Sequence, residues 1–261
     1  MTKKQYEILT AANYDELSRR AAQEFVRRAG EAVQARGIFT VALSGGSTPK
    51  GLYTLLGSDP YRERVPWSKV HVFWSDERCV PPDHPDSNYR MTKMLLLNKV
   101  PIPEENIHRI PAGQEDHNRA AVEYERTIRA FFHLRVGEMP RFDLILLGMG
   151  EDGHTASLFP WTSVLEETNR IASSTYVDRL GEYRLTLTAQ TINHAANVVF
   201  LISGESKSSI LKEVLEGEYQ PQRLPSQLIR PVNGRLLFIV NSAASCKLTQ
   251  LRGGHTHDSN G

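Results

Sequence analysis

His154 stands in a sequence context that suits acid–base chemistry. It ends the segment Gly148-Met-Gly-Glu-Asp-Gly-His154, which follows a run of apolar residues and places Asp152 two positions before the histidine. Histidine titrates near neutral pH and is the commonest general base, and a carboxylate beside the ring can fix its tautomer. Most isolated histidines are structural or lie on the surface, but a position after a glycine-rich strand end favours catalysis. We therefore predict that His154 is the base and that Asp152 belongs to the same site.

A second segment has the composition of a phosphate-binding loop. Ser44-Gly-Gly-Ser-Thr48 follows another apolar run and precedes Pro49, which suits the first turn of a helix. Glycines let an anion approach the backbone closely, and free N–H groups at a helix start attract phosphate. A plain capped turn is the alternative, and the spacing of a P-loop is absent. The predicted phosphate ligands of this segment are Ser44, Gly45, Gly46, Ser47 and Thr48.

Three basic side chains are candidates for binding an anion. Arg78 ends Asp76-Glu-Arg78 after a third apolar run, Lys207 stands at the start of a predicted helix, and Arg184 lies in an alternating, strand-like stretch. A guanidinium suits bidentate binding of phosphate, whereas a lysine at a helix start opposes the helix dipole. A surface ion pair and a solvated lysine are the alternatives. Asp76 and Asp152 are both candidates for orienting the base or the water, and the sequence does not choose between them.

Other chemistries have weaker support in the sequence. Gly148-x-Gly-x-x-Gly153 matches the dinucleotide fingerprint, but Pro160 interrupts the helix that such a site needs, and Ser173 stands where an acid is expected. Serine hydrolysis through Ser44 or Ser47 lacks the spacing of a nucleophile elbow. The histidines and cysteines have no recognised metal-ligand spacing, so we expect no metal site.

Five short apolar runs predict buried strands, because none alternates cleanly with polar residues. They are Phe39–Leu43, Val70–Trp74, Phe142–Leu147, Val198–Ile202 and Leu236–Val240. Apolar residues at helical spacing lie between these runs and predict helices at Tyr14–Arg36, Ser87–Lys99, Glu115–Val136 and Ser206–Glu216. Tyr183–Thr188 alternates and predicts a further strand at an edge, with Arg184 and two threonines on one face.

Strands that alternate with helices predict an α/β fold: a single domain with a mostly parallel, Rossmann-like sheet and helices on both faces. Ligands bind beyond the carboxyl ends of such strands, near a topological switch point. The four polar turns that follow the first four apolar runs should therefore form one site. We assign residues 1–251 to this domain and expect the polar, glycine-rich tail, 252–261, to be disordered.

Composition narrows the classes of function. The 261 residues carry 31 Lys+Arg against 30 Asp+Glu, and this net charge of +1 argues against a nucleic-acid partner or a polybasic membrane surface. The apolar runs are far shorter than the roughly 20 residues that a membrane helix needs. Two cysteines outside any C-x-x-C motif, and a start without a secretory apolar region, predict a cytoplasmic protein.

Three of these segments resemble the 6-phosphogluconolactonases closely. They are Leu43-Ser-Gly-Gly-Ser-Thr-Pro49, Trp74-Ser-Asp-Glu-Arg78 and Leu147-Gly-Met-Gly-Glu-Asp-Gly-His-Thr-Ala-Ser-Leu-Phe-Pro160, in the order of that family. The resemblance implies hydrolysis of a sugar-phosphate lactone, 6-phospho-D-glucono-1,5-lactone, to 6-phosphogluconate in the oxidative pentose phosphate pathway. It also implies a fold like that of the glucosamine-6-phosphate deaminases, and neither a metal nor a nucleotide cofactor. Lactone hydrolysis develops an oxyanion that needs donors, so Arg78 is a catalytic candidate as well, with Arg184 or backbone N–H groups as the alternatives.

Two rival functions stay open. Glucosamine-6-phosphate deaminases share the glycine-rich loop and the Asp-Gly-His, but they typically carry Asp-Glu-Tyr where this chain has Asp76-Glu-Arg78. They also carry an acid soon after the histidine, whereas Thr155–Pro160 holds none. A non-catalytic sugar-phosphate sensor would usually need an attached effector module, and none is apparent in 261 residues. We expect a monomer or a small homo-oligomer.

Overall fold

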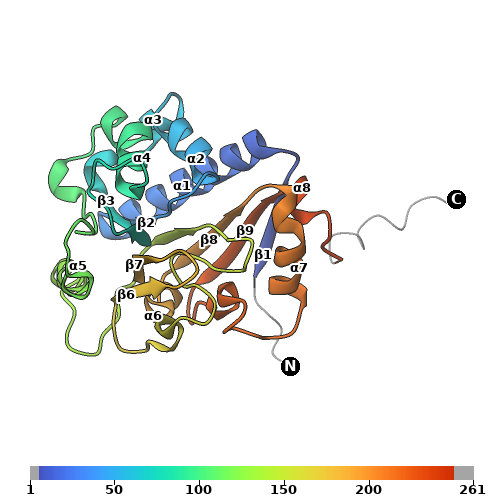
Figure 1. Cartoon of the computed structure of the whole chain (residues 1–261). Coiled ribbons are helices and arrows are strands. Elements are labelled where there is room, and N and C mark those ends of the chain that lie inside the picture. Colours follow the sequence, from blue (N-terminus) through green and yellow to red (C-terminus); the bar gives the residue numbers. More distant parts are fainter. Residues whose placement is uncertain (1–5, 250–261) are drawn as a thin grey trace, which may run out of the picture.

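Parallel β-strands form the centre of the molecule. In the computed structural model, which describes residues 6–249, six strands pair in the order β1-β9-β8-β5-β2-β3, and every neighbouring pair is parallel (Figure 1). Interior strands of such a sheet are covered on both faces, which explains their continuous apolar sequences. The strands are β1 (Glu7–Ala11), β2 (Phe39–Leu43), β3 (Val70–Trp74), β5 (Leu144–Leu147), β8 (Asn197–Ile202) and β9 (Arg235–Asn241).

Three shorter strands form a second, antiparallel sheet. Its order is β4-β7-β6, and its strands are β4 (Asp76–Arg78), β7 (Glu182–Leu187) and β6 (Ala172–Val177). A single residue, Ser75, separates β3 from β4. Its N–H donates to the Leu43 carbonyl at 2.8 Å, and its carbonyl accepts from the Leu187 N–H at 2.7 Å. The small sheet is therefore anchored at the carboxyl ends of β2 and β3.

Helix α1 (Tyr14–Arg36) begins and ends where the sequence predicts. The Asn13 side chain accepts a hydrogen bond from the Glu16 N–H at its start, and Gly37 takes φ +80° at its end. The apolar residues at helical spacing, Leu17 and Phe25 among them, are buried. The other helices are α2 (Pro49–Leu56), α3 (Tyr61–Arg64), α4 (Asn88–Leu95), α5 (His117–Phe131), α6 (Ala189–Asn193), α7 (Ser208–Glu216) and α8 (Ser242–Ser245).

Helices cover both faces of the large sheet. The chain steps from β1 to β2 to β3 in one direction across the sheet, so right-handed connections put α1, α2 and α3 on one face. It then steps back through β5, β8 and β9, which puts α5, α6 and α7 on the other face. In Figure 1, α1–α4 gather on the upper side and α5 and α6 on the lower side. The predicted α/β class with a mostly parallel sheet is confirmed.

The strand order contains a topological switch point between β2 and β5. The chain leaves β2 for β3 on one side, and later returns to β5 on the opposite side of β2. The two glycine-rich segments follow these two strands and begin at Ser44 and Gly148. The four strands β8, β5, β2 and β3 are consecutive in the sheet, so their carboxyl ends lie at one edge. This is the place where ligands bind in open α/β sheets.

Some elements differ from the sequence expectation. The polar residues after β3 form strand β4 rather than a turn, because they pair with β7. The sequence pattern does not predict β1 and β6, which lie at sheet edges and alternate buried and exposed residues less regularly. The helix expected to reach Val136 ends at Phe131, and that expected over Ser87–Lys99 divides into α4 and a 3₁₀ turn. The tail 252–261 lies outside the described residues.

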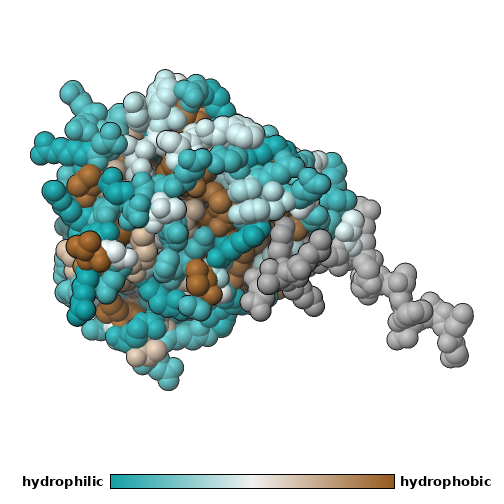
Figure 2. Space-filling model, turned by 90° about the horizontal axis from the view of Figure 1, so that it is seen from below, coloured by the Kyte–Doolittle hydropathy of each residue, from teal (hydrophilic) through white to brown (hydrophobic). Residues whose placement is uncertain are grey.

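The face of the molecule drawn in Figure 2 is mostly hydrophilic. Figure 2 shows one face on which hydrophobic residues form separate groups among polar ones. Scattered apolar groups of this kind are normal on a protein surface. Among the helices of residues 6–249, none is long and apolar enough to cross a membrane.

Two histidines pack into the aromatic core beside β3. The rings of His71 and His108 stack with centroids 5.6 Å apart, and His108 lies 4.4 Å from the Phe73 ring. Nδ1 of His71 and Nε2 of His108 are 3.3 Å apart. Burial lowers the pKa of His71. Burial, together with repulsion from His71 when that ring is protonated, lowers the pKa of His108 to about 4. Both rings are therefore neutral at pH 7.

We predict that acid weakens the fold through His108. An unfolded histidine takes up a proton near pH 6.5, whereas folded His108 resists protonation down to about pH 4, so stability falls as the pH drops through this window. The loss should be at most about 2 kcal/mol, because partial solvent access reduces the effect. Urea unfolding at several pH values measures it. His108→Phe keeps the ring stack and should flatten the dependence; an unchanged slope contradicts the assignment.

Candidate active site

Asp152 holds the His154 ring through one nitrogen. The ring Nδ1 lies 2.5 Å from Asp152 Oδ1, and the His154 backbone N–H donates to the same oxygen at 3.3 Å. The other ring nitrogen, Nε2, has no hydrogen-bond partner within residues 6–249. The His154 side chain is 26% exposed. This geometry leaves one basic nitrogen open to water or a ligand, as a general base requires.

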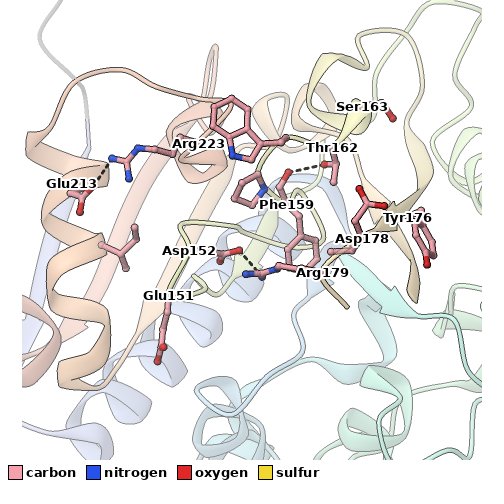
Figure 3. A pocket seen from close by; sticks show the side chains of 14 residues that line it. Glu151, Asp152, Phe159, Thr162, Ser163, Tyr176, Asp178, Arg179, Glu213 and Arg223 are labelled. Carbon is pink, nitrogen blue, oxygen red and sulfur yellow. Dashed lines mark hydrogen bonds and ion pairs between the residues drawn. The ribbon is translucent and has the colours of Figure 1, made fainter. Parts of the chain in front are cut away.

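Two further side chains surround this pair. The Phe159 ring stacks on the His154 ring with centroids 4.1 Å apart and planes 28° apart. Arg179 forms an ion pair with Asp152 Oδ2 at 2.5 Å, and its guanidinium carbon lies 5.0 Å from the centre of the Phe159 ring. Figure 3 shows Arg179 beside Phe159 with its guanidinium directed at Asp152. His154 and Arg179 each contact both Asp152 and Phe159, so the contacts among the four side chains form a ring.

Asp152 is kept ionised by its neighbours. Burial raises the pKa of its carboxyl, but the hydrogen bonds from the ring and backbone of His154 and the charge of Arg179 outweigh burial. The pKa of Asp152 therefore lies below its usual value. A carboxylate at this position accepts a hydrogen bond from Nδ1–H, which makes Nε2 the proton acceptor of the neutral ring.

The histidine loop, Gly148–Leu158, needs glycine beside the catalytic candidates. A Cβ on Gly150 would fall 2.0 Å from His154 Nδ1. Gly153 takes φ +81°, a conformation that favours glycine. Its carbonyl accepts hydrogen bonds at 2.9 Å from the N–H and at 2.8 Å from the hydroxyl of Ser226. Two of the three glycines that match a dinucleotide fingerprint, Gly150 and Gly153, thus have a local structural reason.

The small sheet turns a charged face toward the histidine loop. In the antiparallel register, Asp76 lies opposite Thr186 and Arg78 lies opposite Arg184, so these four side chains share a face. Asp76 Oδ2 accepts a hydrogen bond from Ser157 Oγ at 2.8 Å, and Thr186 Oγ1 accepts from the Ser157 N–H at 3.2 Å. Because Ser157 belongs to the histidine loop, these bonds fix the face against that loop.

Of the two candidate carboxylates, Asp152 contacts the His154 ring and Asp76 binds Ser157 instead. The adjacent acid Glu77 is buried, and burial raises its pKa. Its carboxylate accepts hydrogen bonds from the N–H groups of Asn88 and Tyr89 at 2.7 and 2.8 Å. Glu77 therefore holds the start of α4, where unpaired N–H groups favour an acid.

The glycine-rich loop, Ser44–Thr48, is held by two tyrosine hydroxyls. Tyr53 donates to the Ser44 carbonyl at 2.7 Å and accepts from the Ser44 N–H at 3.1 Å. Tyr14 donates to the Thr48 carbonyl at 3.1 Å. The backbone at both ends of the loop is thus fixed by side chains that lie outside it.

The inner part of the same loop has free N–H groups. A Cβ on Gly45 would overlap the Asn88 side chain, and Gly46 takes φ +92°. Within the described chain, four successive N–H groups make no hydrogen bond, and they belong to Gly45, Gly46, Ser47 and Thr48. Successive free N–H groups at the start of a helix form a nest that attracts anions.

A cavity of about 420 Å³ opens beside this loop. Gly46 and Ser47 line it together with Arg78, so three of the predicted phosphate ligands meet there. Lys50 and Arg90, which the sequence analysis does not select, line it as well. Each lies in the first turn of a helix, where a cation opposes the dipole; the same signal singles out Lys207 in the sequence.

Lys207 and Arg184 are at the same sheet edge but do not line that cavity. Lys207 Nζ lies 3.8 Å from the carboxylate of Glu151 in the histidine loop. The Arg184 guanidinium pairs with Glu182 at 2.5 Å. Ser44 is buried. The structure therefore places Arg78 beside the glycine-rich loop and Lys207 beside the histidine loop, whereas Arg184 pairs with Glu182 within its own strand.

A larger cavity, of about 840 Å³, borders Asp152 (Figure 3). Phe159 and Arg179 also line it, whereas His154 does not. An ion pair between Arg223 and Glu213 forms another part of its wall. Arg179 carries no signal in the sequence, because it lies in a hairpin turn with no motif of its own. Phe159 carries none either, because an aromatic residue in a motif looks like ordinary core.

The fold and these loops define an α/β protein with an anion nest and a His–Asp pair at the switch point. Comparison with known proteins assigns the family. The family model for glucosamine-6-phosphate isomerases/6-phosphogluconolactonase matches residues 12–238. The chain belongs to this family, and the match includes both glycine-rich loops, β4 and Lys207.

Individual relatives agree with the family. A 6-phosphogluconolactonase of Synechocystis sp. is 46% identical over 217 residues, which are 83% of this chain and 88% of that one. A Haemophilus influenzae protein of the same name is 38% identical over 78% of this chain and 85% of its own length. The solved 6-phosphogluconolactonase from Trypanosoma cruzi superposes with a TM-score of 0.85 at 30% identity, over 95% of this chain and 98% of that one. A monomeric glucosamine-6-phosphate deaminase shares the fold, with a TM-score of 0.76 at 20% identity over 92% of this chain and 99% of that one.

We predict that two neighbouring glycines of the histidine loop differ in their tolerance of alanine. Gly150→Ala places a Cβ 2.0 Å from His154 Nδ1, whereas a Cβ on Gly148 meets nothing within 4 Å. Gly150→Ala should destabilise the protein by about 1–3 kcal/mol, a typical cost of overpacking. Gly148→Ala, the matched control, should change stability by less than about 0.5 kcal/mol. Urea unfolding measures both; equal effects argue against the close packing of the loop.

Proposed function

We propose that this protein is an enzyme that hydrolyses 6-phospho-D-glucono-1,5-lactone to 6-phosphogluconate, in the oxidative pentose phosphate pathway. Bacterial and plant relatives named 6-phosphogluconolactonase support this reaction. The observation that carries the mechanism is the hydrogen bonding of the His154 ring. Its Nδ1 lies 2.5 Å from Asp152, and its Nε2 has no hydrogen-bond partner among the described residues. Hydrolysis of a lactone needs a base for water and an acid for the leaving oxygen, and one histidine can serve as both.

The proposed reaction has two proton transfers at one nitrogen. Nε2 of His154 takes a proton from water as the water oxygen bonds to the lactone carbonyl carbon. The tetrahedral intermediate then collapses, the bond between that carbon and the ring oxygen breaks, and the imidazolium returns the proton to the departing ring oxygen. Asp152 stabilises the imidazolium between the two steps. The products are the open-chain acid and the regenerated neutral histidine.

The phosphate of the substrate would bind at the glycine-rich loop. The free N–H groups belong to Gly45 to Thr48, and of these residues Gly46 and Ser47 line the cavity at the start of α2 together with Arg78. These groups match the donor geometry that phosphate favours. Lys207 beside the histidine loop and Arg184 opposite Arg78 add positive charge along the substrate between the two loops.

The histidine loop disfavours the deaminase alternative. Ring opening and isomerisation of an amino sugar need additional acid–base groups, and Thr155–Pro160 contains none. Ser157, within that stretch, binds Asp76 instead. Release of ammonia from glucosamine 6-phosphate would support the deaminase over the lactonase.

We further propose that the enzyme acts in the cytoplasm on the free lactone, without a nucleic-acid or membrane partner. Cys79 and Cys246 are thiols, which suits a reducing compartment. A monomer or a small homo-oligomer stays our prediction for its assembly.

Replacement of His154 tests the proposed base. His154→Ala should lower turnover by about 10²- to 10⁴-fold, the usual contribution of a general acid–base residue. The lactone is generated in situ by oxidation of glucose 6-phosphate, and its loss is followed above the spontaneous rate. A wild-type rate equal to the spontaneous rate rejects the lactonase proposal.

The matched control for this variant is His194→Ala. His194 precedes β8 and so lies at the opposite, amino-terminal edge of the sheet. Its removal should leave turnover unchanged. An active wild type with near-normal His154→Ala would keep the reaction but remove His154 as its base.

Replacement of Arg78 tests the phosphate site. Arg78→Ala should raise KM by about 10- to 100-fold with a smaller change in kcat, because a charge-assisted hydrogen bond to phosphate is lost. Inhibition by inorganic phosphate should weaken in parallel. Arg141→Ala is the control, since Arg141 donates to the Asn233 carbonyl near the start of β9, at the opposite edge. Equal KM values for Arg78→Ala and wild type would exclude Arg78 from phosphate binding.

A further inference from the structure

We propose that Arg179 is a positioning residue for the proposed lactonase reaction, acting through Asp152 and Phe159 on the His154 ring. This inference rests on the proposed function, in which His154 is the base. Arg179 stands 25 residues beyond His154, in the turn of the β6–β7 hairpin, and it belongs to no recognised motif. Its role is visible only in the folded chain.

Two contacts of Arg179 end on the two partners of the histidine. One is the ion pair with Asp152 Oδ2 at 2.5 Å, on the carboxylate whose other oxygen holds His154 Nδ1. The second is the approach of the guanidinium to within 5.0 Å of the Phe159 ring centre, which suits a cation–π contact. Phe159 in turn stacks on the imidazole at 4.1 Å. The histidine is thus fixed in its plane by Asp152 and across its plane by Phe159, and Arg179 contacts both.

The hairpin presents Arg179 from a defined turn. The Gly181 N–H donates to the Val177 carbonyl at 3.0 Å, and Gly181 takes φ +64°, so the turn is closed by the backbone. The Arg179 side chain is 51% exposed and lines the larger cavity (Figure 3). A half-exposed ion pair adds little to folding stability. A substitution here should therefore leave the fold intact and report on the site.

Arg179 also acts on Asp152 through its charge. The charged groups near Asp152 are Arg179 from the hairpin and Glu151 with its partner Lys207. Asp178, Glu213 and Arg223 line the cavity that borders Asp152. Glu213 and Arg223 pair with each other, and Lys207 lies against Glu151. Arg179 is thus the cation in direct contact with the carboxylate. Its removal leaves Asp152 with less opposing charge, which favours the protonated, inactive imidazolium.

The test compares Arg179→Gln, Arg179→Lys and Arg223→Gln with the wild type. Arg223 lines the same cavity as Arg179 but pairs with Glu213, so Arg223→Gln is the matched control. Arg179→Gln should lower kcat by about 3- to 30-fold with little change in KM, because the base is misplaced while the phosphate contacts stay. The acid limb of its pH–rate profile should move to higher pH by roughly half a unit to one unit.

Arg179→Lys should restore the acid limb, since it keeps the charge, but only part of kcat, since a lysine lacks the planar contact with Phe159. Arg223→Gln should change neither. NMR titration of the His154 ring provides a readout that does not depend on activity, and its midpoint should shift with the acid limb.

Several outcomes would overturn the inference. Arg179→Gln with wild-type kcat and an unmoved histidine titration would do so, as would equal effects of Arg223→Gln. A wild type that does not accelerate lactone loss contradicts the proposed function instead. The NMR titration then still decides whether Arg179 affects the protonation of the His154 ring. An active wild type with an inactive His154→Ala and an unaffected Arg179→Gln removes only the positioning role.

Discussion

The parallel ladder between β2 and β5 is the constraint on which the candidate site depends. Both strands are buried, so their backbone groups must pair, and a slip of one residue would reverse which side chains face each helix layer. The observed register pairs Ala42 with Ile145, so β2 and β5 reach the carboxyl edge of the sheet at the same level. The glycine-rich loop and the histidine loop therefore start side by side, at the point where the order of strands reverses.

Side-chain contacts then join loops that the sheet only brings near one another. The Asp76 carboxylate accepts from Ser157 in the histidine loop, and its carbonyl accepts from Asn88 at the start of α4. Asn88 in turn leaves no space for a side chain on Gly45. One aspartate thus links the small sheet, the histidine loop and the glycine-rich loop, which explains a buried acid that does not touch the candidate base.

The near-neutral chain conceals a strongly uneven charge distribution. A net charge of +1 coexists with a cavity lined by Lys50, Arg78 and Arg90. On the other loop, the carboxylate of Asp152 lies between a histidine and an arginine. A small dianion with a reactive carbonyl suits such a division. Its phosphate needs hydrogen-bond donors, and the water that attacks its lactone carbon needs a base.

The sequence by itself determined the α/β class, the five apolar strands, helix α1, and the segments that carry His154 and the anion nest, because these features depend on neighbouring residues and short periodicities. It could not choose between Asp76 and Asp152. It also gave no sign that Lys50 and Arg90 line the cavity beside the glycine-rich loop, or that Arg179 contacts Asp152. Strands β4 and β6 were not predicted from the sequence either. Those features depend on pairing between β4 and β7 and on a hairpin that returns to a loop 25 residues earlier. Contacts between distant segments are decided by tertiary packing, which local sequence patterns do not encode.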